Sequence, residues 1–185
     1  MSYSSQGKLE ERLFCHNEMD LIKEYTRAQI NNDYKIALSE ISGITNGKLL
    51  DKFLQMEIRP ETLTSISLVP LIEVGWADGT LDDLERDSIL KAVEKFGWRK
   101  TSIDYLLLAR WLANKPEPIL FDLWKEYIRN LCNNLSENEV SALKTEILSH
   151  ATAVANASGG IMGIGKICAE EKAVLKEIEN SFVKE

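Results

Sequence analysis

The amino-acid sequence predicts an all-α protein, a compact bundle of about eight to nine helices. Apolar residues recur every three or four positions along most of the 185-residue chain, as they do on one face of a helix. The strict alternation of apolar and polar residues that marks half-buried strands is missing. Helix-capping residues, glycines and prolines divide the chain into segments of helical length.

Residues 1–58 are predicted to form a helical N-terminal extension, packed on an all-α domain of residues 59–185. Apolar residues in the extension favour three short helices, over residues 8–29, 34–42 and 47–56. Gly43 stands where a helix often ends in a left-handed residue. Because three short helices bury little apolar surface among themselves, we expect them to dock on the remainder.

The larger domain begins with a helix from Pro60 to about Ala77. Pro60 suits the first turn of a helix, where its missing N–H costs nothing. Pro70 should kink this helix or split it in two, and we interpret the segment as an ordinary but imperfect helix. Further helices are predicted over residues 82–97, 101–113, 119–133, 136–158 and 170–182.

Residues 68–97 form a predicted helix, a tight acidic turn and a second helix that begins with several carboxylates. The Asp78-Gly79 pair should end the first helix. Asp82 is a good N-cap for the second, and Glu85 completes the spacing of a capping box. The second helix is predicted to turn five apolar residues inward: Leu84, Ile89, Ala92, Val93 and Phe96.

A degenerate copy of this helix-turn-helix pattern lies near the C-terminus. Glu85 aligns with Glu171, and Ser158 takes the place of Asp78. A pseudo-twofold pair of helical hairpins would explain the repeat.

With these residues the chain resembles the TerB-like proteins, a family named after tellurite resistance. The shared pattern is Ala-Asp-Gly, an apolar residue and an acidic helix start ending in Glu, here Ala77 to Glu85. The resemblance covers residues 60–185. It implies a compact all-α fold, a place in bacterial tellurite-resistance, stress-response or phage-defence systems, and a divalent-metal site in the acidic turn. It implies no enzymatic activity.

The acidic turn is a candidate metal site, because converging carboxylates favour hard cations such as Ca²⁺ or Mg²⁺. The candidate ligands are five acidic residues: Asp78, Asp82, Asp83, Glu85 and Glu171. Their spacing is not that of the EF-hand loop. In the alternative interpretation, Asp78 makes a turn while Asp82 and Glu85 cap the helix. That interpretation explains Asp82 and Glu85 fully and leaves Asp78 and Asp83 less well explained.

A glycine-rich connector, Gly159–Gly165, precedes the last helix. With Lys166 it has the spacing of a phosphate-binding loop, but a helix rather than a strand precedes it. Ile167 also stands where Ser or Thr would bind Mg²⁺. We interpret the segment as a connector whose apolar residues, Ile161 among them, pack on the core or contact a partner.

Composition restricts the partners. The net charge of −7 argues against nucleic acid and anionic membranes, and no apolar run is long enough to cross a bilayer. Three widely separated cysteines suit free thiols in a reducing cytosol. Cys15 and His16 are adjacent on a predicted helix and therefore point apart. We expect a cytoplasmic protein that binds a protein partner, without nucleic acid and without membrane insertion.

The predicted function is that of a non-enzymatic TerB-like stress-response protein that acts through partner binding, with or without a divalent cation in the acidic turn. A second hypothesis is a purely structural interaction module without metal. A third is a hydrolase whose paired carboxylates hold a catalytic metal.

Overall fold

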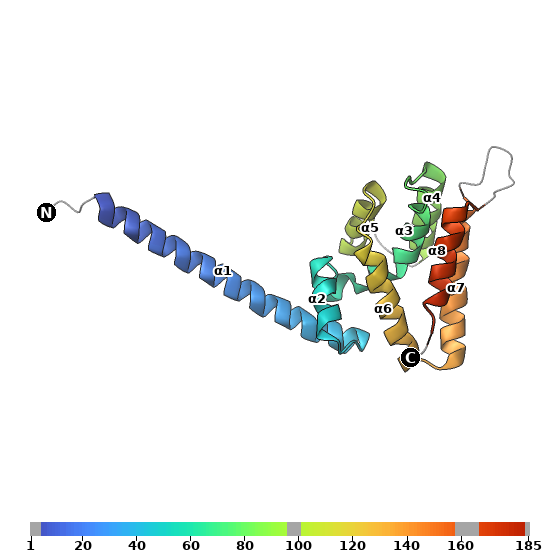
Figure 1. Cartoon of the computed structure of the whole chain (residues 1–185), viewed down its shortest axis with the longest axis horizontal. Coiled ribbons are helices and arrows are strands. Elements are labelled where there is room, and N and C mark those ends of the chain that lie inside the picture. Colours follow the sequence, from blue (N-terminus) through green and yellow to red (C-terminus); the bar gives the residue numbers. More distant parts are fainter. Residues whose placement is uncertain (1–4, 96–100, 158–166, 184–185) are drawn as a thin grey trace.

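A computed structural model describes residues 5–95, 101–157 and 167–183, with side chains from residue 19 to residue 94 in the first range. These ranges contain eight α-helices and one 3-10 helix and no β-strand, which confirms the all-α prediction (Figure 1). No helix within them is both long and apolar enough to span a bilayer.

The first helix, α1 (Ser5–Ser42), is continuous where two shorter helices were predicted. The predicted break at the polar residues near position 31 is wrong. Asn and Asp cost at most roughly 0.7 kcal/mol each in a helix relative to Ala, and neither Gly nor Pro interrupts residues 8–42. The helix ends at Gly43, as predicted. Gly43 has a φ of 71°, and its N–H donates to the Ser39 carbonyl over 2.9 Å.

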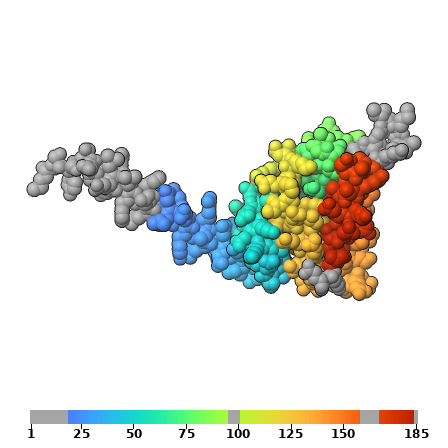
Figure 2. All heavy atoms as spheres, in the orientation of Figure 1, coloured from blue at the N-terminus to red at the C-terminus, as the bar shows by residue number. Residues whose placement is uncertain are grey.

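Much of α1 projects from the body of the molecule (Figures 1 and 2). Residues 21–33, which we call the arm, are exposed without interruption, and burial begins at Tyr34. The arm includes Leu21, Ile22 and Tyr25, which are 65%, 64% and 66% exposed. The last turns of α1 pack on α2 (Gly47–Gln55) and on the 3-10 helix η1 (Pro60–Leu68), where Leu38 is fully buried.

Pro70 splits the predicted 60–77 helix in two. The chain forms η1 and then α3 (Val69–Gly75), with Pro70 in the first turn of α3. In the first turn of a helix a backbone N–H has no intrahelical acceptor, so a proline there loses no hydrogen bond. Inside one long helix, Pro70 would leave the carbonyl four residues earlier without its donor. The single helix predicted for this segment is therefore replaced by two elements.

The short helix α3 lies at the centre of the fold. It packs against α4 (Asp83–Lys95), α6 (Ile119–Asn134), α7 (Glu137–Ala155) and α8 (Ala169–Asn180). All its residues except Glu73 are buried. α7 also contacts α4 and α8, while α5 (Ile103–Ala113) packs on η1 and α2 packs on α6. α3 thus positions the acidic turn that follows it.

Several predicted helix starts are confirmed. Ser102 caps α5 by accepting from the Tyr105 N–H over 3.2 Å, and Ser136 and Glu139 form a capping box at the start of α7. The predicted inward orientation of Leu84 is wrong, because this side chain is 59% exposed. It lies in the first turn of α4, on the side away from the core. Ile89, Ala92 and Val93 are buried as predicted, and Phe96 lies outside the described residues.

Candidate functional site

The acidic turn begins where α3 ends. Gly79 has a φ of 95°, a left-handed value that favours glycine, and its N–H donates to the Trp76 carbonyl over 3.0 Å. The carboxylate of Asp78 accepts from the backbone N–H of Thr80 over 2.9 Å and from its hydroxyl over 3.0 Å. Asp78 therefore has a structural role that the sequence left less well explained.

The predicted capping box at the start of α4 is present. Asp82 Oδ1 accepts from the Glu85 N–H over 2.8 Å, and Glu85 Oε2 accepts from the Asp82 N–H over 2.9 Å. The start of α8 repeats this arrangement with a thiol in place of the first carboxylate. Cys168 Sγ accepts from the Glu171 N–H over 3.3 Å, and Glu171 Oε2 accepts from the Cys168 N–H over 2.6 Å.

Glu85 and Glu171 are buried acids, only 5% and 4% exposed. Burial raises the pKa of Glu85 to about 7 because it removes water from the carboxylate. The Asp82 N–H lowers this pKa, while the negative charges of Asp82, Asp78 and Glu171 raise it. The fold therefore brings Glu85 and Glu171 within electrostatic range of each other.

The five predicted metal ligands do not form a ready-made cage. Among the described residues, no group of three or more His, Cys, Asp or Glu side chains is arranged to hold a metal ion. Asp78, Asp82, Glu85 and Glu171 accept the hydrogen bonds given above, and Asp83 is exposed in the first turn of α4. Metal binding by this set stays a prediction.

The turn is tied to the end of α5 by three hydrogen bonds. The Trp76 indole N–H donates to the Trp111 carbonyl over 3.0 Å, and the Lys115 ammonium donates to the Trp76 carbonyl over 2.8 Å. Arg86 Nη2 donates to the Leu112 carbonyl over 3.3 Å. Since helix carbonyls at a C-terminus lack partners within the helix, the Trp76 and Arg86 donors stabilise the end of α5. Lys115, which follows α5, ties the chain to the end of α3.

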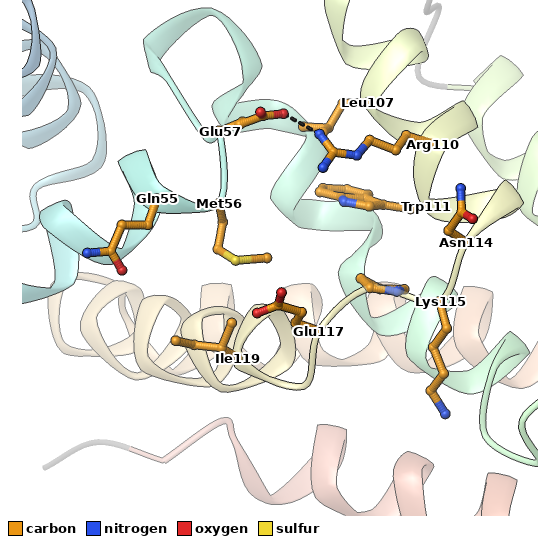
Figure 3. Close-up of a pocket in the computed structure, with 11 residues that line it drawn as sticks. Gln55, Met56, Glu57, Leu107, Arg110, Trp111, Asn114, Lys115, Glu117 and Ile119 are labelled. Carbon is orange, nitrogen blue, oxygen red and sulfur yellow. Dashed lines mark hydrogen bonds and ion pairs between the residues drawn. The ribbon is translucent and has the colours of Figure 1, made fainter. Parts of the chain in front are cut away.

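A pocket of about 370 Å³, not foreseen from the sequence, lies beside this end of α5 (Figure 3). Its walls come from the end of α2, from α5 and from the linker that leads into α6. The residues that line it include Met56, Glu57, Arg110, Trp111, Glu117 and Ile119. Because the end of α2 is far from α5 and its following linker in the chain, no local motif marks the pocket in the sequence.

Glu57 forms one edge of the pocket in a strained backbone conformation, with a φ of 62°. The Ile58 N–H donates to the Phe53 carbonyl over 2.8 Å, and the Glu57 N–H donates to the Leu54 carbonyl over 3.2 Å. These two bonds make a Schellman motif at the end of α2, and Glu57 occupies the position where glycine is usual.

The charges around the pocket differ in their partners. Glu57 pairs with Arg110 across the rim, and the Lys115 ammonium is bound to the Trp76 carbonyl. The Glu117 carboxylate lies beside the end of the Met56 side chain (Figure 3). Within the described part of the chain, this carboxylate has no hydrogen-bond or ion-pair partner. Glu117 is exposed, so water solvates its carboxylate.

Other predicted features have a purely structural role or lie outside the described residues. Trp111 and Trp124 are buried in the core. The connector Gly159–Gly165 and the side chains of Cys15 and His16 lie outside the described structure.

Comparisons of the chain with protein-family models, curated protein sequences and solved structures found no match.

Proposed function

We propose that this chain is a non-enzymatic, TerB-like protein of bacterial stress response that acts by binding a protein partner. The sequence support is the Ala77–Glu85 pattern with its second copy ending in Glu171. The packing supports it as well. If the α3–α4 hairpin corresponds to the α7–α8 hairpin, then α3 and α7 contact each other, and each also contacts the second helix of the other hairpin. With a reciprocal capping box at the start of both α4 and α8, this arrangement fits a pseudo-twofold pair of hairpins.

The observation that carries partner binding is the exposed arm of α1. Its apolar side chains, Leu21, Ile22 and Tyr25, each leave about two thirds of their surface in water. Burying such a side chain contributes roughly 1.5–3 kcal/mol. A helix without tertiary contacts is only marginally stable in water, so a partner that covers the arm would stabilise both the helix and the complex.

A matched pair of variants of the full chain tests this proposal. Tyr25→Asp places a charge among the apolar residues of the arm, while Asn31→Asp adds the same charge on another side of the helix. Each protein encoded beside this gene is tested for binding to wild type and to both variants. We expect Tyr25→Asp to weaken binding at least tenfold and Asn31→Asp to leave it unchanged. Equal binding by all three proteins would contradict a role for the arm.

A divalent cation in the acidic turn is the second part of the proposal. Its support is the burial of Glu85 and Glu171 close enough to interact electrostatically, since a cation would relieve this repulsion. A ligand that binds only the folded state raises the melting temperature. We expect Ca²⁺ or Mg²⁺ at millimolar concentration to raise it for wild type and less for Asp78→Ala. An unchanged melting temperature would leave the structural interaction module without metal as the better hypothesis.

A further inference from the structure

The arm of α1 carries a shallow hollow on one side. Tyr25, Ala28, Gln29 and Asn32 line it together with Asp33. The first four are spaced i, i+3, i+4 and i+7, and so form the four-residue hole that receives one side chain of a facing helix in a coiled coil. Ala28 leaves this hole open, because its side chain is a single methyl group. The shape of the hollow therefore suits a second helix.

The hollow faces away from the helical body. At about 100° per residue, Tyr25 lies about 140° and Gln29 about 180° around α1 from Leu38, which is buried against the body. Ile22 and Ile36 lie seven residues before and after Gln29, and they are 64% and 52% exposed. The exposed stripe thus follows the seven-residue repeat of a coiled-coil seam, along the projecting helix (Figures 1 and 2).

We propose that α1 pairs with α1 of a second copy of this chain in an antiparallel coiled coil. Tyr25 of each copy fills the hollow of the other copy and lies over its Ala28, which places the two-fold axis near residue 27. The inference rests on the proposed function, in which the arm binds a protein, and it names that protein as a second copy.

Charge favours a second copy as the occupant. The arm carries two basic and two acidic side chains: Lys23, Arg27, Glu24 and Asp33. The arm is therefore neutral, and the net charge of −7 lies in the rest of the chain. Two arms meet without the repulsion that two acidic bodies would have.

Two observations favour the antiparallel orientation. It keeps the acidic bodies at opposite ends of the helix pair, which limits their repulsion. It also places the large apolar ring of Tyr25 in the hollow, whereas an in-register parallel pair would place the small Ala28 or the polar Gln29 there.

The length of α1 sets the size of this interface. With the axis near residue 27, the two helices overlap over residues 12–42, a length of about 45 Å. A helix is about 10–12 Å wide, so the pair buries roughly 1,000 Å² in total, which is near the lower limit for specific interfaces. We therefore expect a dimer that dissociates in the micromolar range.

Sedimentation equilibrium of the full chain, over a micromolar to millimolar concentration series, tests the dimer. Ala28→Trp fills the hollow, while Asn31→Trp places the same side chain on another side of the helix. Both positions are exposed, so neither change should affect folding, which circular dichroism checks. We expect Ala28→Trp to weaken dimerisation roughly tenfold or more, and Asn31→Trp to leave it unchanged. A monomer at every concentration, or equal weakening by both variants, would overturn the proposal.

Crosslinking with a short bifunctional maleimide tests the orientation, in chains that also carry Cys15→Ser. The antiparallel pair places residue 22 of one copy level with residue 32 of the other, while the two residues 22 are about 15 Å apart along the axis. We expect a covalent dimer when Ile22→Cys and Asn32→Cys chains are mixed, and none from either chain alone. A covalent dimer from Ile22→Cys alone would show a parallel pair and would contradict the proposal.

The Tyr25→Asp variant separates this inference from the proposed function. A monomeric wild type whose binding to another protein is still weakened by Tyr25→Asp would overturn the dimer and leave the proposed function standing. A monomeric wild type that binds no other protein through the arm would contradict both. A wild-type dimer that Tyr25→Asp dissociates and Asn31→Asp does not would support the second copy as the partner of the arm.

Discussion

Glu57 shows how one residue can carry both strain and a contact. Its left-handed backbone closes the Schellman motif of α2, while its side chain reaches Arg110. Both groups of this ion pair are more than half exposed, so the pair contributes little, roughly 0–1 kcal/mol. The backbone strain therefore affects stability more than the ion pair does.

Replacing Glu57 with Gly should raise the free energy of unfolding by about 1 kcal/mol. Glycine adopts the left-handed conformation without steric cost, which outweighs the loss of an exposed ion pair. Urea denaturation measures the change, with Glu57→Ala as the control. The alanine variant loses the same pair but keeps the strain, so it should be slightly less stable than wild type. A glycine variant no more stable than the alanine variant would contradict this account.

Glu85 should make the stability of the fold depend on pH. Its folded pKa of about 7 lies above the ordinary value of 4.5, so the folded state binds a proton that the unfolded state releases. The penalty for burying the charge is absent below pH 4.5 and grows as the pH rises through 7. We expect wild type to lose on the order of 1–3 kcal/mol relative to Glu85→Gln between about pH 5 and pH 8.

Urea unfolding of wild type and Glu85→Gln at several pH values isolates the contribution of Glu85, because the two proteins have all their other titrating groups in common. Glutamine keeps an oxygen that can accept from the Asp82 N–H, so the capping box is retained. Parallel pH profiles for wild type and Glu85→Gln would show that the carboxylate is ionised throughout this range.

At the scale of the element, α1 has two ends with different energetic roles. Leu38 is fully buried under α2 and η1, whereas Leu21 is 65% exposed on the arm. Leu38→Ala should cost about 2–5 kcal/mol, because it leaves a cavity in the core. Leu21→Ala should cost less than about 0.5 kcal/mol. Urea denaturation of the two variants checks this contrast, and equal losses would mean that the arm is covered within the free protein.

The elements also show how far the sequence could predict this fold. Capping residues such as Asp82, Ser102 and Ser136 act within four residues of the chain, and their hydrogen bonds match the prediction. The continuity of α1 was missed because a run of polar residues weakens a helix without ending it. Leu84 was misplaced because, at about 100° per residue, it lies about 140° around the helix from Ile89 and about 180° from Val93, off the buried stripe of α4.

The candidate site divides in the same way. The acidic turn was visible in the sequence because its residues are neighbours in the chain, and its capping roles follow from their spacing. The pocket was invisible because the end of α2 meets α5 and the following linker only in the folded protein. A left-handed conformation at Glu57, where glycine is the usual signal, left no trace in the sequence.

At the scale of the whole molecule, the packing converges on the end of α3. A Cβ added at Gly75 would lie 2.6 Å from Leu81 Cδ1 and 3.3 Å from Ile89 Cδ1, so glycine lets the turn and α4 close against α3. The same Cβ would be 3.7 Å from Val154 Cγ1 of α7. A side chain at this position would therefore meet the turn, α4 and α7 together.

Gly75→Ala should lower the free energy of unfolding by about 1 kcal/mol, because overpacking outweighs the better helix propensity of alanine. The double variant with Leu81→Val removes the closest atom and should recover part of that loss relative to Leu81→Val alone. Thermal and urea unfolding of the four proteins complete the cycle. Additive effects would show that Leu81 moves aside without cost.

The length of α1 has a mechanical consequence. A helix rises about 1.5 Å per residue, so residues 8–33 span roughly 40 Å. Neither Gly nor Pro interrupts this segment, and a continuous helix resists bending. A molecule held at the far end of α1 is therefore kept at a set spacing from the helical body. If a partner covers and stabilises the arm as proposed, α1 would also fix the distance between that partner and the helical body.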